Sequence, residues 1–218
     1  MSNPFIEFLR PHKTVPKTPW TAKSRWDLSL PRICVLFFGL FIFGLGDSLL
    51  IQSTIGNAPW SVLAQGVSDQ LDITMGWSTF AISTLVLLLW IPLRLRPGLG
   101  TLLNAVEIGL VENFAQDLIP QTDNMAIRIA FMVAGLCILA AGSGLYIGAE
   151  FGSGPRDGLM LGLNKRFGIS VRLARTLIEI TVMIIGIFLG GHIGIGTFAF
   201  ALGIGPMVQV TLRLFKMS

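Results

Sequence analysis

The chain repeats itself along its length, and the distance between the two copies is constant at 96 residues (128 − 32 = 96 and 205 − 109 = 96). Without any gap, Arg32 aligns with Arg128 and Pro59 with Pro155. The block Gly98-Leu99-Gly100-Thr101 aligns with Gly194-Ile195-Gly196-Thr197. Apolar composition would match some Leu and Ile by chance, but it would not keep Gly and Pro in register over most of the chain. The repeat therefore predicts two related structural units.

The composition places both units in a membrane. Hydrophobic residues make up 52% of the chain and charged residues only 13%, with a mean hydropathy of +0.72, whereas a soluble domain carries about a quarter charged residues. A membrane-spanning helix needs about 20 mainly apolar residues. The chain has six candidate spans, and the third, residues 99–118, is the most polar of them because it contains Asn104, Glu107, Glu112 and Asn113. The six candidates are residues 32–52, 76–93, 99–118, 126–148, 174–191 and 194–214.

The distribution of Lys and Arg predicts the topology. The N-terminal tail, the turn after the second span, the connection 149–173 and the C-terminus are basic, whereas the connections 53–75, 119–127 and 192–193 contain no Lys or Arg. This alternation is what the positive-inside rule predicts for six spans with both termini in the cytoplasm. If residues 99–118 did not cross, the basic connection 149–173 would lie outside, so the charge pattern favours the doubtful third span.

We therefore expect an all-α membrane protein of three parts. Residues 1–28 form a basic cytoplasmic tail that can lie on anionic lipid, residues 29–120 form the first three-helix repeat, and residues 121–218 form the second. Because three spans is an odd number, the second repeat enters from the opposite side of the membrane. The expected fold is six transmembrane helices in two inverted-topology repeats, an arrangement found in many secondary transporters and in some channels.

Each repeat also carries a loop rich in Gly and Pro, followed by a short amphipathic helix. The first loop contains Asn57, Trp60 and Ser61, and the second contains Arg156 and Asp157. Pro suits the first turn of a helix, and a helix N-terminus offers free N–H groups to a ligand. We interpret these five residues as substrate-binding and expect the loops at opposite ends of one polar cavity between the repeats. The alternative is a tight turn before an interfacial helix.

Charged residues inside the spans are the other candidates for the substrate site. Arg175 and Glu179 are four residues apart and share one helix face, so we expect them to pair and to face the protein interior. Glu107, with Asn104 one turn before it, is expected to reach a polar cavity, because intramembrane ionisable groups commonly serve function. The alternatives are a structural clamp for Arg175 and Glu179 and a protonated packing carboxyl for Glu107.

Other functional classes lack support in the sequence. It contains no nucleotide-binding loop, no cluster spaced to bind a metal and no pairing of nucleophile with base, so we expect no enzyme activity, no cofactor and no metal. The net charge of +4 lies in the tail and the loops, and we expect no nucleic acid partner. The expected partners are the lipid bilayer and an unidentified small-molecule solute. Glycines at helix-contact spacing, such as Gly144 and Gly148, indicate close helix packing within the chain or in a homodimer.

These features together resemble a known family. The Gly56–Trp60 loop, the paired Gly-x-Gly-Thr blocks, the segment Gly152–Met160, the Arg175/Glu179 pair and the closing Gly203–Pro206 are similar to the YczE/YitT group of bacterial integral membrane proteins. The resemblance covers about residues 32–210. It implies a multi-pass protein of the bacterial plasma (inner) membrane, and the association of some members with regulators that bind pyridoxal phosphate suggests a vitamin-B6-like solute. Many relatives carry an acidic residue where this chain has Ser61.

Two functions remain open from the sequence. The first is a secondary transporter or permease for a small solute, which the inverted repeats and the paired polar loops favour. The second is a membrane protein that does not transport, such as a scaffold or a regulatory partner of another system.

Overall fold

The computed structural model describes residues 17–215, and this part of the chain is helical throughout, with eight helices and no strand. The expected tail, residues 1–28, therefore lies largely outside the described residues. Its last part, from residue 17 on, packs against the ends of the helices: Ala22 N donates to Ala149 O at 2.9 Å, and Leu99 N donates to Arg25 O at 2.9 Å. The helices are α2 (Leu30–Ser53), α3 (Pro59–Leu71), α4 (Met75–Leu93), α5 (Leu99–Leu118), α6 (Met125–Gly148), α7 (Pro155–Phe167), α8 (Val171–Phe188) and α9 (Ile195–Leu214).

Each predicted span is a long helix. The observed ends differ from the predicted ends by at most three residues. Four helices, α2, α4, α6 and α9, are long and apolar enough to cross a bilayer. The remaining two, α5 and α8, contain 20 and 18 residues, but their charged side chains, which include Glu112 and Arg175, lower their hydropathy.

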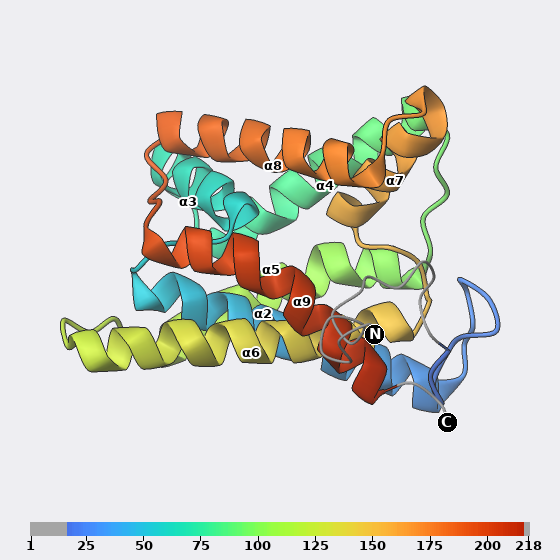
Figure 1. The fold of residues 1–218 in the computed structure, drawn as a ribbon, viewed down its shortest axis with the longest axis horizontal. Helices are drawn as coiled ribbons and strands as arrows, with labels where there is room; N and C mark the ends of the chain where they lie inside the picture. Colours follow the sequence, from blue (N-terminus) through green and yellow to red (C-terminus); the bar gives the residue numbers. More distant parts are fainter. Residues whose placement is uncertain (1–16, 216–218) are drawn as a thin grey trace, which may run out of the picture.

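The helices pack into two groups (Figure 1). In one group α2 packs against α5 and α6, and α6 packs against α9. In the other group α3 packs against α4 and α8, and α7 packs against α4 and α8. The main helix contact between the groups is that of α4 with α5.

Glycine sets the closest approach within the first group. A Cβ atom at Gly46 of α2 would lie 2.5 Å from the backbone nitrogen of Leu139 and 2.8 Å from the carbonyl oxygen of Gly135 on α6. A Cβ atom at Gly142 would lie 2.5 Å from the backbone nitrogen of Phe43. Small residues let two membrane helices bring their backbones together in this way, so these glycines fix the crossing of α2 and α6.

The two short helices each begin at a proline after a glycine-rich turn. Gly56 and Gly152 have φ angles of +139° and +114°, which only glycine adopts readily. Pro59 and Pro155 then occupy the first turns of α3 and α7, where a missing N–H costs nothing. Both prolines are buried. The turns therefore lead the chain into the protein interior, and each short helix begins there.

Candidate functional site

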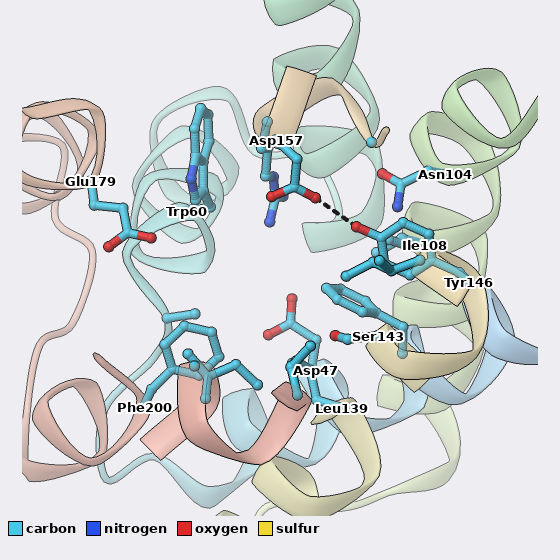
Figure 2. Close-up of a pocket in the computed structure, with 18 of the residues that line it drawn as sticks. Asp47, Trp60, Asn104, Ile108, Leu139, Ser143, Tyr146, Asp157, Glu179 and Phe200 are labelled. Atoms are coloured by element: carbon cyan, nitrogen blue, oxygen red, sulfur yellow. Dashed lines mark hydrogen bonds between the residues drawn. The ribbon is translucent and has the colours of Figure 1, made fainter. Parts of the chain in front are cut away.

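A cavity of about 310 Å³, with charged and uncharged polar residues in its wall, lies between the two groups of helices. Figure 2 shows the carboxyl groups of Asp47, Asp157 and Glu179 directed towards its open centre. Each of the eight helices contributes at least one residue to its wall. The charged residues that line it are Asp47, Arg156, Asp157, Arg175 and Glu179, and the uncharged polar residues are Thr79, Ser83, Asn104, Ser143, Tyr146 and Gln209.

The starts of the two short helices meet in this cavity. The guanidinium carbon of Arg156, at the start of α7, lies 5.1 Å from the centre of the Trp60 ring, at the start of α3. A cation over an aromatic face at this distance is attracted to it. The expectation that the two loops lie at opposite ends of the cavity is therefore wrong. The topology put the loops on opposite sides of the membrane, but each turn re-enters the protein and delivers its helix start to the same place.

The first loop reaches the cavity through a buried carboxyl group. Ser61 Oγ donates to Asp47 of α2, at 3.0 Å from each carboxylate oxygen. Asp47 is 1% exposed. At the 96-residue offset Ser143 corresponds to Asp47 and Asp157 to Ser61 (143 − 47 = 96 and 157 − 61 = 96). Each repeat thus has one serine and one aspartate at these two positions, but the aspartate is on the long helix in the first repeat and on the short helix in the second.

Asp157 is held by a tyrosine of α6. Tyr146 Oη donates to Asp157 Oδ2 at 2.6 Å (Figure 2). A hydrogen bond to a charged acceptor is roughly twice as strong as one between neutral groups. The Tyr146 side chain is buried at 4% exposure, so it holds the Asp157 carboxylate in a fixed position in the cavity wall.

The expected pair on α8 is confirmed. Arg175 Nε donates to Glu179 Oε1 at 2.8 Å, and both side chains line the cavity. Their side chains are 45% and 23% exposed. The pair therefore adds one charge of each sign to a wall that already contains Arg156, Asp157 and Asp47.

The remaining predicted site residues lie at different distances from the cavity. Asn104 lines it and lies under the second loop, where a Cβ atom on Gly154 would be 3.1 Å from Asn104 Oδ1. Asn57 turns away and donates to Gln65 Oε1 at 2.9 Å. Glu107 is half-buried and is not among the lining residues. Its role, like that of Asn57, stays a prediction.

Three residues of the site escaped the sequence-based prediction. Asp47 and Tyr146 line the cavity, and Glu112 lies behind Asp47, where it is 1% exposed and neither carboxylate oxygen has a hydrogen-bond partner. A signal for Asp47 was present in the sequence, since it is the single acidic residue in the first span. No comparable signal marked Tyr146, because a tyrosine in an apolar helix is ordinary packing material until its partner is known. Within residues 17–215, no group of three or more His, Cys, Asp or Glu side chains could hold a metal ion.

The chain has relatives in bacteria. It is 41% identical over 202 residues to an uncharacterized protein of Haemophilus influenzae, covering 93% of each chain. It is 30% identical to the uncharacterized membrane protein YczE of Bacillus subtilis, covering 81% of this chain and 83% of YczE. It is also 28% identical to the uncharacterized protein YyaS of Bacillus subtilis, covering 73% of this chain and 81% of YyaS. No solved structure matches it.

The same relationship extends to a whole family. Residues 30–213 match the family of unknown function DUF6198, a range that contains every helix described above except the last residue of α9. The resemblance to the YczE group that the loop motifs suggested is confirmed by this match and by the similarity to YczE. The chain belongs to the DUF6198 family, a YczE-type family.

Proposed function

We propose that this protein is a secondary transporter for a small polar solute that carries charges of both signs. The observation that carries the proposal is the cavity at the meeting point of the starts of the two short helices. The wider proposal is a six-span protein of the plasma membrane, with both termini in the cytoplasm, built from two inverted repeats.

Reciprocal contacts between the halves support the inverted repeat. Gly196 N donates to Ile55 O at 3.2 Å, and Gly100 N donates to Phe151 O at 3.1 Å. The residues correspond at the repeat offset (151 − 55 = 96 and 196 − 100 = 96). If a twofold axis relates two copies, every contact between the first loop and the second repeat must have such a counterpart. Transporters built from inverted repeats place their substrate site at the repeat interface, beside the ends of discontinuous helices.

One pair of corresponding contacts breaks the symmetry, and it does so beside the cavity. On α4 and α5 the backbones touch at Gly76 and Gly109, and Gly76 N donates to Asn113 Oδ1 at 2.9 Å. The counterparts in the second repeat are Arg172, Gly205 and Gln209. A Cβ atom on Gly205 would meet no heavy atom within 4 Å, and the buried Gln209 Oε1 has no hydrogen-bond partner.

Alternating access gives this asymmetry a function. Exchange of the two arrangements would separate α4 from α5 and bring α8 against α9, with the unpaired Gln209 taking the role that Asn113 has now. The group formed by α3, α4, α7 and α8 would move as one body against the other group. In this proposal the missing contact at Gly205 between α8 and α9 is the opening of the cavity, and with both termini in the cytoplasm that opening would face the cytoplasm.

The wall of the cavity indicates the solute class. Three carboxyl groups and two guanidinium groups line it, and residues at the starts of α3 and α7, where helix N–H groups are free, line it as well. Opposite charges on one small solute would match a lining that carries charges of both signs. A volume of about 310 Å³ lies at the lower end of the range of about 300–1,000 Å³ for small-molecule sites.

The test begins with ligand identification and ends with flux. Zwitterionic metabolites, with pyridoxine, pyridoxal and pyridoxamine among the first probes, are screened for thermal stabilisation of the purified protein. A ligand at 100 times its Kd stabilises the folded state by about 2.7 kcal/mol. Radiolabelled hits are then offered to proteoliposomes. We expect uptake by the wild type and loss of uptake in Arg156→Ala, because Arg156 lines the cavity.

The matched control is Arg166→Ala, which removes the same side chain from the exposed end of the same helix. It should transport as the wild type does, and both variants should keep the elution volume of the wild type. Equal flux in wild type and Arg156→Ala would remove the cavity from the mechanism. Absence of uptake and of exchange for every stabilising probe would favour a scaffold or regulatory protein that does not transport.

A further inference from the structure

Two buried carboxyl groups lie side by side where α2 meets α5. Asp47 and Glu112 are each 1% exposed, and their charges act directly on one another. Asp47 lines the cavity and accepts a hydrogen bond from Ser61. Glu112 lies behind it, and neither of its oxygens has a hydrogen-bond partner. A buried carboxyl group without a partner is costly and calls for a physical explanation.

The charges around the pair indicate what is missing. Among residues 17–215, Arg156 of α7 is the one cation that acts on both carboxyl groups. Two ionised carboxylates and one guanidinium leave one negative charge uncompensated in the protein interior, and two carboxylates at one site do not both ionise readily. If the pair holds a single proton, its remaining charge of −1 balances the guanidinium. The protonated carboxyl group can then donate a hydrogen bond to the other.

The other groups that face the pair do not supply a second positive charge in place of this proton. Thr79 of α4 is a neighbour of Glu112, and Ser61 of α3 donates to Asp47. The titratable groups of α6 and α7 nearest to the pair, Tyr146 and Asp157, are bonded to one another. Arg175 and Glu179 of α8 form their own pair across the cavity, and α9 contributes the uncharged Gln209. Within the described part of the chain, Arg156 is therefore the only cation that the two carboxyl groups share.

A polar line continues from the pair towards the end of α2. Gln116 lies one turn after Glu112 on α5, and Gln52 Nε2 donates to Gln116 O at 3.2 Å. The Oε1 atom of Gln52 and the Nε2 atom of Gln116 are buried without partners. Gln52 is the penultimate residue of α2. Side-chain groups able to exchange hydrogen bonds with water thus extend from the cavity to the end of the helix that lies opposite the cytoplasmic opening.

We infer that Asp47 and Glu112 form a proton-binding site that shares one proton and couples its movement to that of the solute. The coupling rests on the transport function proposed above. The proton reaches Glu112 along the line of Gln52 and Gln116 when the outer side is open. It leaves through Asp47 and the cavity when the inner side is open. No bond other than that of the proton to a carboxylate oxygen forms or breaks.

The first experiment measures protonation without any solute. Infrared difference spectra of the full-length protein in detergent, recorded over a pH series in H₂O and in D₂O, resolve the C=O stretch of a protonated buried carboxyl group. We expect such a band near neutral pH in the wild type and its loss in Glu112→Gln. Asp117→Asn is the matched control, since Asp117 is an exposed carboxyl on the same helix, and it should keep the band. A wild-type spectrum without a band that depends on Glu112 overturns the inference whatever the transport results are.

The second experiment measures coupling in proteoliposomes with a radiolabelled probe that the wild type transports. With one proton per solute, a gradient of one pH unit supports about tenfold accumulation. We expect Glu112→Gln to lose this accumulation and to keep exchange of labelled for unlabelled probe, which needs no net proton movement. Accumulation that follows a sodium gradient instead, or that ignores the pH gradient in the wild type, overturns the inference. A Glu112-dependent infrared band without flux of any probe would refute the transport function and the coupling, and would leave only the proton-binding site.

Discussion

One pair of substitutions tests the open and closed sides of the cavity directly. Gly109 on α5 and Gly205 on α9 correspond at the repeat offset (205 − 109 = 96). A Cβ atom on Gly109 would lie 2.5 Å from the carbonyl oxygen of Gly76 on α4, whereas a Cβ atom on Gly205 would meet nothing within 4 Å. We expect Gly109→Ala to destabilise the protein and Gly205→Ala to leave it as stable as the wild type or more so.

The comparison of the two variants isolates the steric effect. Both glycines lie inside long helices, so alanine adds about 0.5–1 kcal/mol of helix stability at each position. This gain cancels in the difference between the variants. What remains is the strain of forcing an extra methyl group against backbone that cannot rotate away, which costs about 1–3 kcal/mol. The free energy of unfolding of Gly109→Ala should therefore lie about 1–3 kcal/mol below that of Gly205→Ala.

Thermal unfolding in detergent, followed by tryptophan fluorescence, provides the assay. A change of 1 kcal/mol shifts Tm by about 2–4 °C for a chain of this length, so the two variants should differ by several degrees. Equal destabilisation by both would mean that α8 packs against α9 at Gly205 in the same way as α4 packs against α5, and the open side inferred above would be refuted. If alternating access operates, Gly205→Ala should also slow transport, because α9 must approach α8 in the other state.

Two further predictions concern the supports of the site. Trp90 of α4 donates from Nε1 to the carbonyl oxygen of Pro155 at 3.1 Å, so Trp90→Phe leaves that buried oxygen unpaired and should lower the free energy of unfolding by about 1–3 kcal/mol. Trp77→Phe, on the exposed face of the same helix, should change it by less than about 0.5 kcal/mol. Chemical or thermal unfolding measures both effects. Hydrogen bonds from the backbone amides of Lys23 and Ser29, with Lys23 the larger effect, lower the pKa of Asp27 from 3.8 to about 2. The stability that its ionised form contributes is therefore complete above about pH 4 and is lost as the pH falls towards 2. The difference in Tm between wild type and Asp27→Asn should shrink over that range, and a difference that stays constant would contradict the assignment.

The helices could be predicted because each depends on a local pattern. Apolar stretches of about 20 residues form helices wherever the backbone must satisfy its own hydrogen bonds, and the Pro residues at 59 and 155 marked the first turns of α3 and α7. The repeat offset carried information about tertiary contacts as well. Gly46 and Gly142 align at this offset, and each lies where α2 and α6 approach most closely.

The position of the loops could not be predicted from topology. Charge counts assign a connection to one side of the membrane, but they do not say how deep the connection returns into the protein. That depth follows from the positive φ angles of Gly56 and Gly152, and from contacts such as that of Ser61 with Asp47. A glycine in a loop is compatible with many turns. The meeting of Trp60 and Arg156 therefore appears only once the chain is folded.

The place of the carboxyl groups shows how two copies of one repeat can serve different roles. In the second repeat the acid is Asp157, beside Arg156 on the short helix and held by Tyr146. In the first repeat the short helix has Ser61 instead, and the acid is Asp47 on the long helix. The long helix is where Glu112 can reach it. Placing the carboxyl group on α2 and not on α3 thus keeps it in the cavity and gives it a buried carboxyl neighbour, which Asp157 lacks. A symmetric pair of solute-binding loops would not need that displacement, whereas a transporter that binds its solute on one side of the cavity and a proton on the other would.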